Sequence, residues 1–147
     1  MSRPRWVAPA TFAMAIASTA VSAYLTIAHF TSPKVLACAS SGVVNCERVT
    51  TSAQSEVFGV PVALLGLAWS LAMCGLCTTW AWRSVEPWIR IARLAAVVTG
   101  MAFVLWLVYA ELFIIDAICL WCTVVHALAF ALFVIVVLYG TETGEDS

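Results

Sequence analysis

The sequence predicts an all-α integral membrane protein, an up-and-down bundle of four transmembrane helices with an outer loop that bears a short interfacial helix. Its 147 residues are 63% hydrophobic and only 10% charged, whereas soluble domains are roughly half apolar and a quarter charged. Four uncharged runs each approach the roughly 17–25 residues that a helix needs to cross a membrane. The net charge of −1 offers no basic surface for phosphates, which argues against nucleic-acid binding.

We expect a single domain over residues 1–147, with four spans and one longer outer loop. The spans are predicted at about 8–30, 58–81, 89–111 and 118–139, and the outer loop at about 31–57. The third run is the shortest between charges, but the aliphatic stems of Arg90 and Arg93 can extend to the membrane interface. An even number of spans places both termini on the same side of the membrane.

Basic residues are distributed unequally between the two sides of this topology. One side carries Arg3, Arg5, Arg83, Arg90 and Arg93. The other side carries only Lys34 and Arg48. Because positively charged connections stay in the cytoplasm, we expect a multi-pass protein of the cell membrane with both termini cytoplasmic. The outer loop and the start of the fourth span then lie on the extracytoplasmic face.

The start of the chain also resembles a cleavable signal peptide. Arg3 and Arg5 precede an apolar run that contains the small-residue sequence "VSA" at 21–23. The apolar run continues beyond this point, through residues 24–28. This length suits a retained first span better than a short signal sequence, so we favour the retained span.

The outer loop contains the segment "NCERVTTSAQSEVFGVP" at 45–61, in which Val49, Val57 and Phe58 lie among polar residues. This pattern predicts a short interfacial helix that leads into the second span, and the alternative is a solvated loop. Pro61 suits the first turn of a helix, since that position has no backbone hydrogen bond to lose.

The six cysteines form three pairs, and their chemistry depends on the side of the membrane that each pair occupies. In "CGLC", Cys74 lies roughly 24 Å from the outer end of the second span at a rise of about 1.5 Å per residue, close to the cytoplasm. Cytosolic thiols stay reduced, so we predict that Cys74 and Cys77 are packed thiols, with a second redox pair as the alternative. A metal site at this pair would need further ligands nearby, and we predict no metal site.

The other two pairs share the outer face. In "CLWC", Cys119 and Cys122 start the fourth span on one helix face, where unpaired N–H groups and the helix dipole favour a nucleophilic thiolate. Cys38 and Cys46 bracket the turn-forming residues 40–42, so a disulfide that closes this loop is geometrically reasonable. An exposed disulfide can exchange with other thiols, and the alternative is a purely structural link.

Two cysteine pairs on one face predict a two-step electron relay, from the loop pair in water to the pair embedded in the membrane. The sequence shows no flavin or nicotinamide motif, and the fourth span is immersed in lipid. The natural terminal acceptor is therefore a hydrophobic quinone dissolved in the bilayer.

The loop pair, the downstream "SAQSEVFGVP" and the helix-borne "CLWC" together resemble the vitamin K epoxide reductase family in its bacterial form. The resemblance extends over about residues 10–140. It implies a four-helix bundle around a quinone pocket that opens near the outer face. It also implies a quinone-dependent thiol–disulfide oxidoreductase that reoxidises a secreted thioredoxin-like (DsbA-like) partner and so supports disulfide formation.

The resemblance assigns a role to each of the four outer cysteines. It implies that Cys38 and Cys46 are the shuttle pair and that Cys119 and Cys122 are the active-site pair. Cys46 is expected to join Cys119 in an internal mixed disulfide, and Cys122 is expected to face the quinone. The expected quinone is menaquinone or a related compound of the vitamin K type.

Candidate residues of the quinone pocket are Ser52, Phe58, Leu65, Trp69, Tyr109, Trp121 and His126. Ser52 matches the family's loop Ser or Thr near the active-site thiols, and a turn or helix-cap role is the alternative. His126 lies one turn inward from Cys122 and is a candidate donor to a quinone carbonyl, although a bond to a neighbouring helix also explains it. The aromatic and Leu side chains either wall the pocket or simply pack. Glu111 and Asp116 either handle protons or mark the interface.

One departure from the family concerns the redox partner. Many bacterial members carry a fused thioredoxin-like domain after the fourth span, whereas this sequence ends at Ser147, so we expect a separate partner protein. A free-standing reductase of quinone or vitamin K epoxide, like the vertebrate members, is one alternative. A structural four-span protein with a loop disulfide and a metal-binding membrane protein are others. The unrelated quinone-linked disulfide oxidases carry the Cys-x-x-Cys pair in the first outer loop and the more widely spaced pair in the second, the reverse of the order here.

Overall fold

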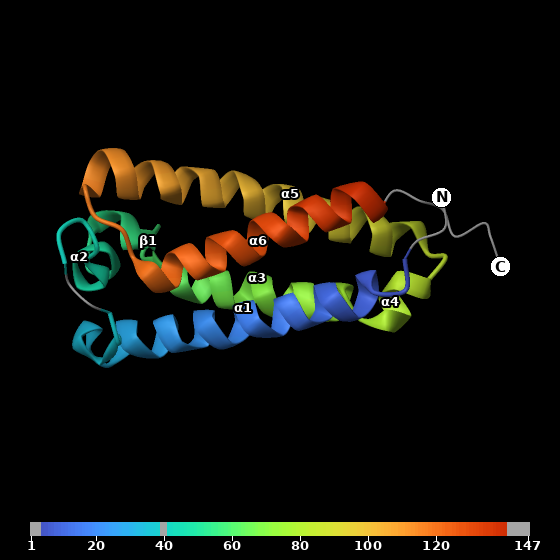
Figure 1. Ribbon diagram of the computed structural model, residues 1–147, viewed down its shortest axis with the longest axis horizontal. Coiled ribbons are helices and arrows are strands. Elements are labelled where there is room, and N and C mark those ends of the chain that lie inside the picture. The colour runs from blue at the N-terminus through green and yellow to red at the C-terminus, as the bar shows by residue number, and fades with distance from the viewer. Residues whose placement is uncertain (1–3, 39–40, 141–147) are drawn as a thin grey trace.

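Four helices form the body of the molecule in the structure, a computed structural model that describes residues 4–38 and 41–140. Arg3, assigned above to the cytoplasmic side, lies outside these residues. The helices are α1 (Val7–Phe30), α3 (Val62–Leu76), α5 (Pro87–Tyr109) and α6 (Leu120–Tyr139). They run up and down in chain order, and α1 begins at the end of the bundle where α6 finishes (Figure 1).

Neighbouring helices close into a ring. α1 contacts α3 and α6, and α5 completes the ring by packing on the same two helices. The contact between α3 and α5 is the smallest of these four. At the start of α1 and the end of α6, the rings of Trp6 and Tyr139 meet edge to face, with their centres 5.7 Å apart. Small polar side chains on α1 are buried, namely Thr11, Ser18, Ser22 and Thr26, as is usual where helices approach closely in a membrane.

Three helical stretches are long and apolar enough to cross a membrane: α1, α6, and Pro87–Ile115, in which α5 continues into the wider π-helical segment η3 (Ala110–Ile115). α3 is also apolar but has only 15 residues. The prediction of a helical membrane protein is confirmed at this level. A membrane crossing by α3 stays a prediction.

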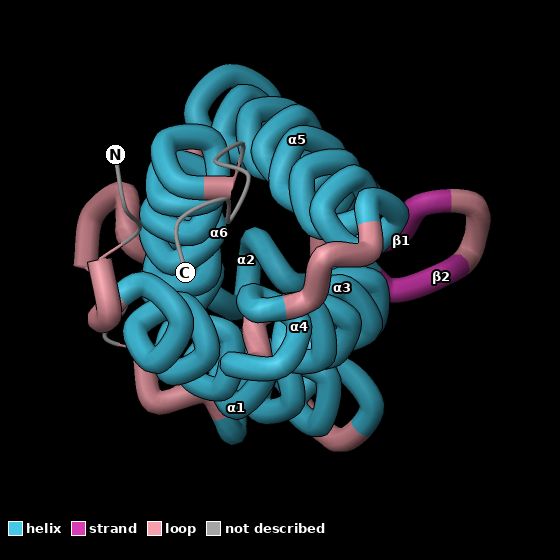
Figure 2. The backbone as a smooth tube through the Cα atoms, turned by 90° about the vertical axis from the view of Figure 1, so that its right-hand side faces the viewer, coloured by secondary structure: helices cyan, strands magenta, loops and turns pink. Residues whose placement is uncertain are grey.

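The second apolar run differs from the continuous helix predicted for 58–81. Its first residues belong to a hairpin in which β1 (Glu56–Val57) pairs antiparallel with β2 (Val60–Pro61). The hairpin turns at Phe58 and Gly59, whose φ values of 52° and 78° lie in the left-handed region. The hairpin projects beside the helices (Figure 2), and α3 begins only after it.

The same run also breaks before its predicted end. α3 finishes at Leu76, and the short helix α4 (Thr79–Arg83) follows after Cys77 and Thr78. The Thr78 hydroxyl caps α4 by accepting the backbone N–H of Ala81 at 3.2 Å, a role for which Thr is well suited. Three shorter elements therefore replace the predicted continuous helix.

Arg93 closes the α4 end of the bundle. Its guanidinium lies 3.6 Å from the centre of the Trp82 ring and donates to the Leu76 carbonyl at 3.0 Å. The Trp82 indole N–H donates to the Thr11 hydroxyl at 3.0 Å, which ties α4 to α1. A cation is favourable at a helix C-terminus, and stacking on Trp contributes about 0.5–2 kcal/mol. Cys77 is buried in the same apolar cluster as Trp82 and is a free thiol, in the way expected of a packed cysteine.

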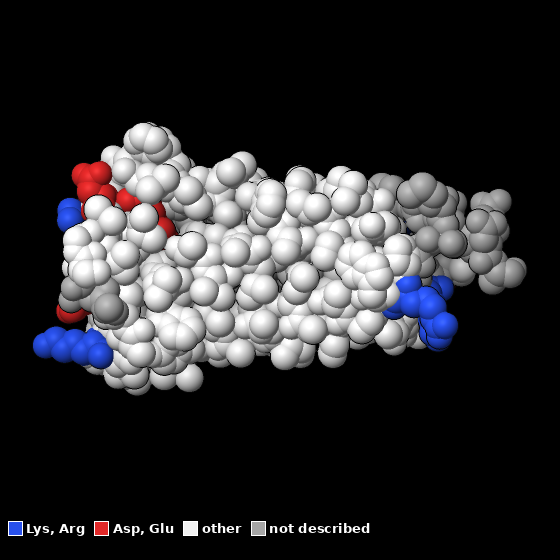
Figure 3. All heavy atoms as spheres, viewed as in Figure 1, with Lys and Arg blue, Asp and Glu red and all other residues white. Residues whose placement is uncertain are grey.

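The loop between α1 and α3 covers the other end of the bundle. It contains the turn η1 (Pro33–Val35), helix α2 (Cys46–Thr50) and the turn η2 (Ala53–Ser55). A short helix is thus present in the loop as predicted, but η2 and the hairpin separate it from α3, and its interfacial position stays a prediction. Asn45 caps it, because its Oδ1 accepts the backbone N–H of Arg48 at 2.9 Å. Acidic side chains gather at this end, and the long middle of the visible face is uncharged (Figure 3).

Candidate active site at the loop end of the bundle

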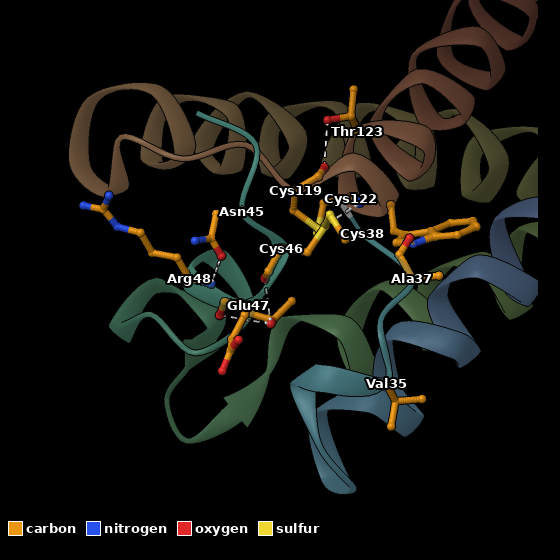
Figure 4. Close-up of a disulfide and its surroundings, with 12 residues drawn as sticks. Val35, Ala37, Cys38, Asn45, Cys46, Glu47, Arg48, Cys119, Cys122 and Thr123 are labelled. Atoms are coloured by element: carbon orange, nitrogen blue, oxygen red, sulfur yellow. Dashed lines mark hydrogen bonds between the residues drawn. A yellow bond between two sulfur atoms is a disulfide. The ribbon is translucent and has the colours of Figure 1, made fainter. Parts of the chain in front are cut away.

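A disulfide joins Cys38 and Cys46 and closes a small loop at this end (Figure 4), with the Cα atoms 6.1 Å apart. Within the loop, Ser41 and Val44 exchange backbone hydrogen bonds of 3.2 and 3.1 Å. Gly42 supplies the positive φ of 59° that the turn requires. Cys46 is buried and Cys38 is partly exposed. The predicted disulfide is therefore present, and its Cys38 side is the more accessible.

A short parallel bridge joins this loop to the segment before α6. Ile118 donates its backbone N–H to the Val43 carbonyl at 2.8 Å and accepts that of Asn45 at 3.0 Å. The bridge pairs Val44 with Ile118, so Cys119 lies opposite Asn45, the residue before Cys46. This register brings Cys46 and Cys119 close together. Both belong to one buried cluster, and the disulfide lies against the second cysteine pair in Figure 4. The two pairs, far apart in sequence, meet here.

Trp121 and Tyr24 hold the other side of the loop. The Trp121 indole N–H donates to the carbonyl of Ala37, the residue before Cys38, at 3.1 Å. The Tyr24 hydroxyl donates to the Val35 carbonyl and accepts the N–H of Ala37, both at 2.9 Å. The two rings meet edge to face at 5.2 Å. The chain on both sides of the disulfide is thus fixed to the helix bundle.

Cys119 occupies the N-cap position of α6. Its Sγ accepts the backbone N–H of Cys122 at 3.3 Å, and its carbonyl accepts the Thr123 hydroxyl at 2.9 Å. Cys119 precedes the apolar helix, and a hydrogen bond from the Cys122 side chain lowers the pKa of its thiol, although burial opposes the shift. The helix N-terminus also favours a thiolate here. Both cysteines are free thiols, so a dithiol adjoins a disulfide.

A cavity of about 560 Å³ lies between the helices and the outer loop. Residues of α1, α3, α5, η3 and α6 line it, together with loop residues between Val49 and Ser55. Cys122 belongs to the lining, whereas Cys119 does not and is fully buried. Small-molecule sites typically measure roughly 300–1,000 Å³ and are mostly apolar, as this one is. One cysteine of the dithiol therefore adjoins the loop disulfide and the other reaches the cavity.

Four of the predicted pocket residues line this cavity: Ser52, Leu65, Trp69 and His126. His126 is buried on α6, one turn from Cys122. The Ser52 hydroxyl donates to the Val49 carbonyl at 2.7 Å and so also closes a turn of the loop. The structure thus brings these four residues together with Cys122.

The other three predicted residues lie outside the lining, namely Phe58, Tyr109 and Trp121. Phe58 stands fully exposed at the tip of the hairpin. Tyr109 is half exposed and stacks on Phe113, with ring centres 5.2 Å apart. Trp121 holds the loop, as described above. These residues are predicted to line the pocket because they are aromatic, but the residue type does not reveal which way a side chain faces.

Trp69 forms one wall of the cavity and joins α3 to α5. Its indole N–H donates to the Ala96 carbonyl at 2.8 Å. A Cβ added to Gly100 would stand 2.7 Å from the Trp69 ring, so only glycine permits this approach. Nearer the loop, the lining includes Leu65 of α3 and Trp106 of α5, which are 36% and 49% exposed. The cavity therefore opens sideways between α3 and α5.

Glu111 is a cavity residue that the sequence leaves ambiguous, because an acidic residue near the end of a span also suits the membrane interface. Its side chain is buried and lines the cavity together with Cys122 and His126. The available sequence signal is a carboxylate among the apolar residues of "AELFII". Gly100 carries no such signal, since its role depends on a contact with another helix.

No curated protein matches the chain by sequence similarity. A model of the vitamin K epoxide reductase family matches residues 9–137, which include both outer cysteine pairs and the residues that line the cavity. The match covers most of the chain, and the chain therefore belongs to the vitamin K epoxide reductase family.

Proposed function

We propose that the chain is a quinone-dependent thiol–disulfide oxidoreductase of the cell membrane that reoxidises a secreted thioredoxin-like protein and so supports disulfide formation. Membership of the family supports membrane-bound redox chemistry of this kind. The observation that carries the proposal is the arrangement of the cysteines: a disulfide packs against a dithiol, of which Cys122 lines the cavity. A disulfide that only stiffens a loop does not require a free pair beside it.

Electrons enter at the loop pair. The dithiol of the partner protein reduces the Cys38–Cys46 disulfide and becomes a disulfide itself. The Cys46 thiolate then attacks Cys119 in the oxidised Cys119–Cys122 pair, which forms the mixed disulfide and releases the Cys122 thiolate. Attack by Cys38 on Cys46 restores the loop disulfide and releases the Cys119 thiolate. Each exchange conserves both electrons and needs only a thiolate aligned with a disulfide.

Electrons leave at Cys122. A quinone in the cavity takes two electrons from the Cys119–Cys122 dithiol, whose S–S bond forms again, and two protons, which convert both carbonyls to hydroxyls. The size and the mostly apolar lining of the cavity support a quinone ring as occupant, and menaquinone or a related vitamin K-type compound is the expected substrate. We assign His126 a hydrogen bond to one quinone carbonyl, with Ser52 as a second polar group in the wall.

The sideways opening between α3 and α5 supports delivery of this substrate from the bilayer. Quinones are dissolved in lipid, and the lining residues Leu65 and Trp106 are partly exposed on this side. A ring can enter between the helices while its apolar tail stays among the lipid chains. The Trp69–Gly100 contact closes the gap further from the loop.

The proposal includes four spans with both termini in the cytoplasm. The short helix α3 packs between α1 and α5, with the hairpin before it in the chain and α4 after it. Arg5, Arg83 and Arg90 belong to the end of the bundle away from the loop, and Figure 3 shows basic side chains there. The positive-inside rule then places the loop outside, where disulfides persist.

The test combines the purified chain with a reduced thioredoxin-like protein and a short-chain quinone. Quinone absorbance and partner thiols are followed together, and we expect one quinone reduced for each partner disulfide formed. A variant with alanine at Cys74 and Cys77 is the matched control and should retain nearly full turnover, because this pair lies at the other end of the bundle. A partner that is oxidised repeatedly while the quinone stays unchanged, or no reaction of either, contradicts the proposal.

A further inference from the structure

Glu111 and Asp116 follow α5 in the sequence, and the structure gives them opposite surroundings. Asp116 is exposed and ends η3 in the left-handed conformation, with φ of 52°. Glu111 is 6% exposed and lines the cavity. An acidic side chain inside a membrane protein is costly, and such residues usually face a functional cavity or pathway. The burial of Glu111 therefore points to a role that Asp116 does not share.

Glu111 lies beside the dithiol and shares the cavity wall with Cys122. Its carboxylate interacts with the backbone N–H of Cys119. It is also close enough to Cys119 and Cys122 for direct electrostatic interaction with both thiols. His126 shares the cavity wall with it. The Glu111 carbonyl accepts the backbone N–H of Ala117 at 3.1 Å, which fixes the chain as it turns back toward α6.

The charged and titratable groups around Glu111 are Cys119, Cys122 and His126 from the start of α6, His29 from α1, and Glu47 and Arg48 from α2. The two α2 side chains are exposed to solvent. The lining residues of α3 and α5 are uncharged, and those of the outer loop are neutral. Of the described residues that line the cavity, none is a lysine or arginine. No such cation in the wall holds Glu111 permanently in its charged form.

We propose that Glu111 carries protons between the Cys119–Cys122 dithiol and the quinone, an inference that rests on the proposed function. As the dithiol closes to a disulfide, two electrons pass to the quinone and the two thiol protons are released. The Glu111 carboxylate accepts one proton and gives it to a quinone oxygen, which returns the side chain to its charged form. A second passage delivers the second proton, so the quinone gains two electrons and two protons.

The surroundings explain why a relay is needed. Cys119 is fully buried and does not line the cavity, so its thiol proton needs a protein group to reach a quinone there. Among the described acidic residues, Glu111 alone belongs to the cavity lining. Proton transfer by a positioned side chain typically accelerates a reaction by about 10²–10⁴-fold.

The test compares the full chain with Glu111→Gln and Glu111→Asp in a single turnover of quinone reduction. Each protein is reduced with dithiothreitol, freed of the reagent and mixed with a short-chain quinone. Gln keeps the shape but cannot carry a proton, so we expect a rate lower by about tenfold or more and a flattened pH profile. Asp keeps the carboxyl and should stay within about fivefold of the wild-type rate. Reduction of the Cys38–Cys46 disulfide by dithiothreitol should be unchanged in both variants.

Asp116→Asn is the matched control, since it removes the same charge from the exposed neighbour and should leave the rate unchanged. If the wild type reduces quinone and Glu111→Gln does so at the same rate, the relay is overturned and the proposed function stands. If the wild type reduces no quinone, the proposed function is overturned as well. If the Gln variant does not fold, Glu111→Ala decides, assayed with and without added formate. A slow rate that formate restores supports the relay, and an Ala variant at the wild-type rate overturns it.

Discussion

The backbone N–H of Asn45 donates to the Ile118 carbonyl at 3.0 Å, and a cysteine follows each of these residues. This hydrogen bond belongs to the parallel bridge that sets the register between the outer loop and the start of α6. The register sets Cys119 opposite Asn45 and so brings it close to Cys46, while Cys122 reaches the cavity. The electron path that we propose depends on this arrangement.

Removal of the Cys38 sulfur is expected to trap the internal mixed disulfide. In Cys38→Ala, Cys46 has lost its loop partner, and the bridge holds it beside Cys119. Mass spectrometry of unreduced peptides under oxidising conditions should then find the Cys46–Cys119 link in most molecules. A double variant that also carries Cys119→Ala is the control and should lack the link. Its absence from the single variant would remove the proposed relay.

Loss of the Asn45 side chain is expected to loosen α2. Asn45→Ala removes the oxygen that caps the helix through the backbone N–H of Arg48, and such a loss costs about 0.5–2 kcal/mol. We expect faster hydrogen exchange of the α2 amides and slower transfer between the two cysteine pairs. Asn45→Asp keeps an acceptor oxygen and should behave like the wild type. Unchanged hydrogen exchange in Asn45→Ala would show that the cap does not hold the helix.

Trp121→Phe is expected to make the loop disulfide easier to reduce. The variant keeps a ring against Tyr24 but loses the hydrogen bond to the Ala37 carbonyl. Such a bond contributes about 0.5–1.5 kcal/mol, so reduction by dithiothreitol should become about 2–10-fold faster. Trp80→Phe is the control, since Trp80 is exposed at the α4 end. Equal reduction rates in Trp121→Phe and the wild type would rule out this anchoring role.

Gly100→Ala is expected to disturb the wall of the cavity. The new Cβ would meet the Trp69 ring at 2.7 Å, and overpacking of this kind typically costs about 1–3 kcal/mol. We expect a lower thermal unfolding temperature in detergent and a higher KM for the quinone. Gly75→Ala is the control, because a Cβ there meets open space. A Gly100→Ala variant with wild-type stability and KM would show that this contact does not shape the site.

The sequence predicts the long helices well because their length follows from the thickness of the bilayer. α1, α5 and α6 lie close to the predicted spans. The second run was harder to predict, because its hairpin depends on left-handed backbone at Phe58 and Gly59. Phe is not a typical turn residue, and an apolar run gives no warning of such a turn.

The turn-forming residues between Cys38 and Cys46 make a loop disulfide predictable, and that disulfide is confirmed. The side of the membrane that the cysteines occupy stays a prediction. The register between the outer loop and α6 is not predictable from the sequence, since it rests on backbone hydrogen bonds between segments far apart in the chain. Glu111 lies in the π-helical segment η3 and is buried there, and the sequence does not predict that segment. Side-chain direction at these points is a property of the fold.

In the proposed mechanism, electrons reach the quinone through Cys122. The most direct test is quinone reduction by Cys122→Ala in the presence of excess reduced partner, compared with the wild type. We expect this variant still to oxidise about one equivalent of partner at its loop disulfide, because that exchange does not involve Cys122. We expect no quinone reduction above background. Quinone turnover at the wild-type rate in Cys122→Ala would rule out this electron path.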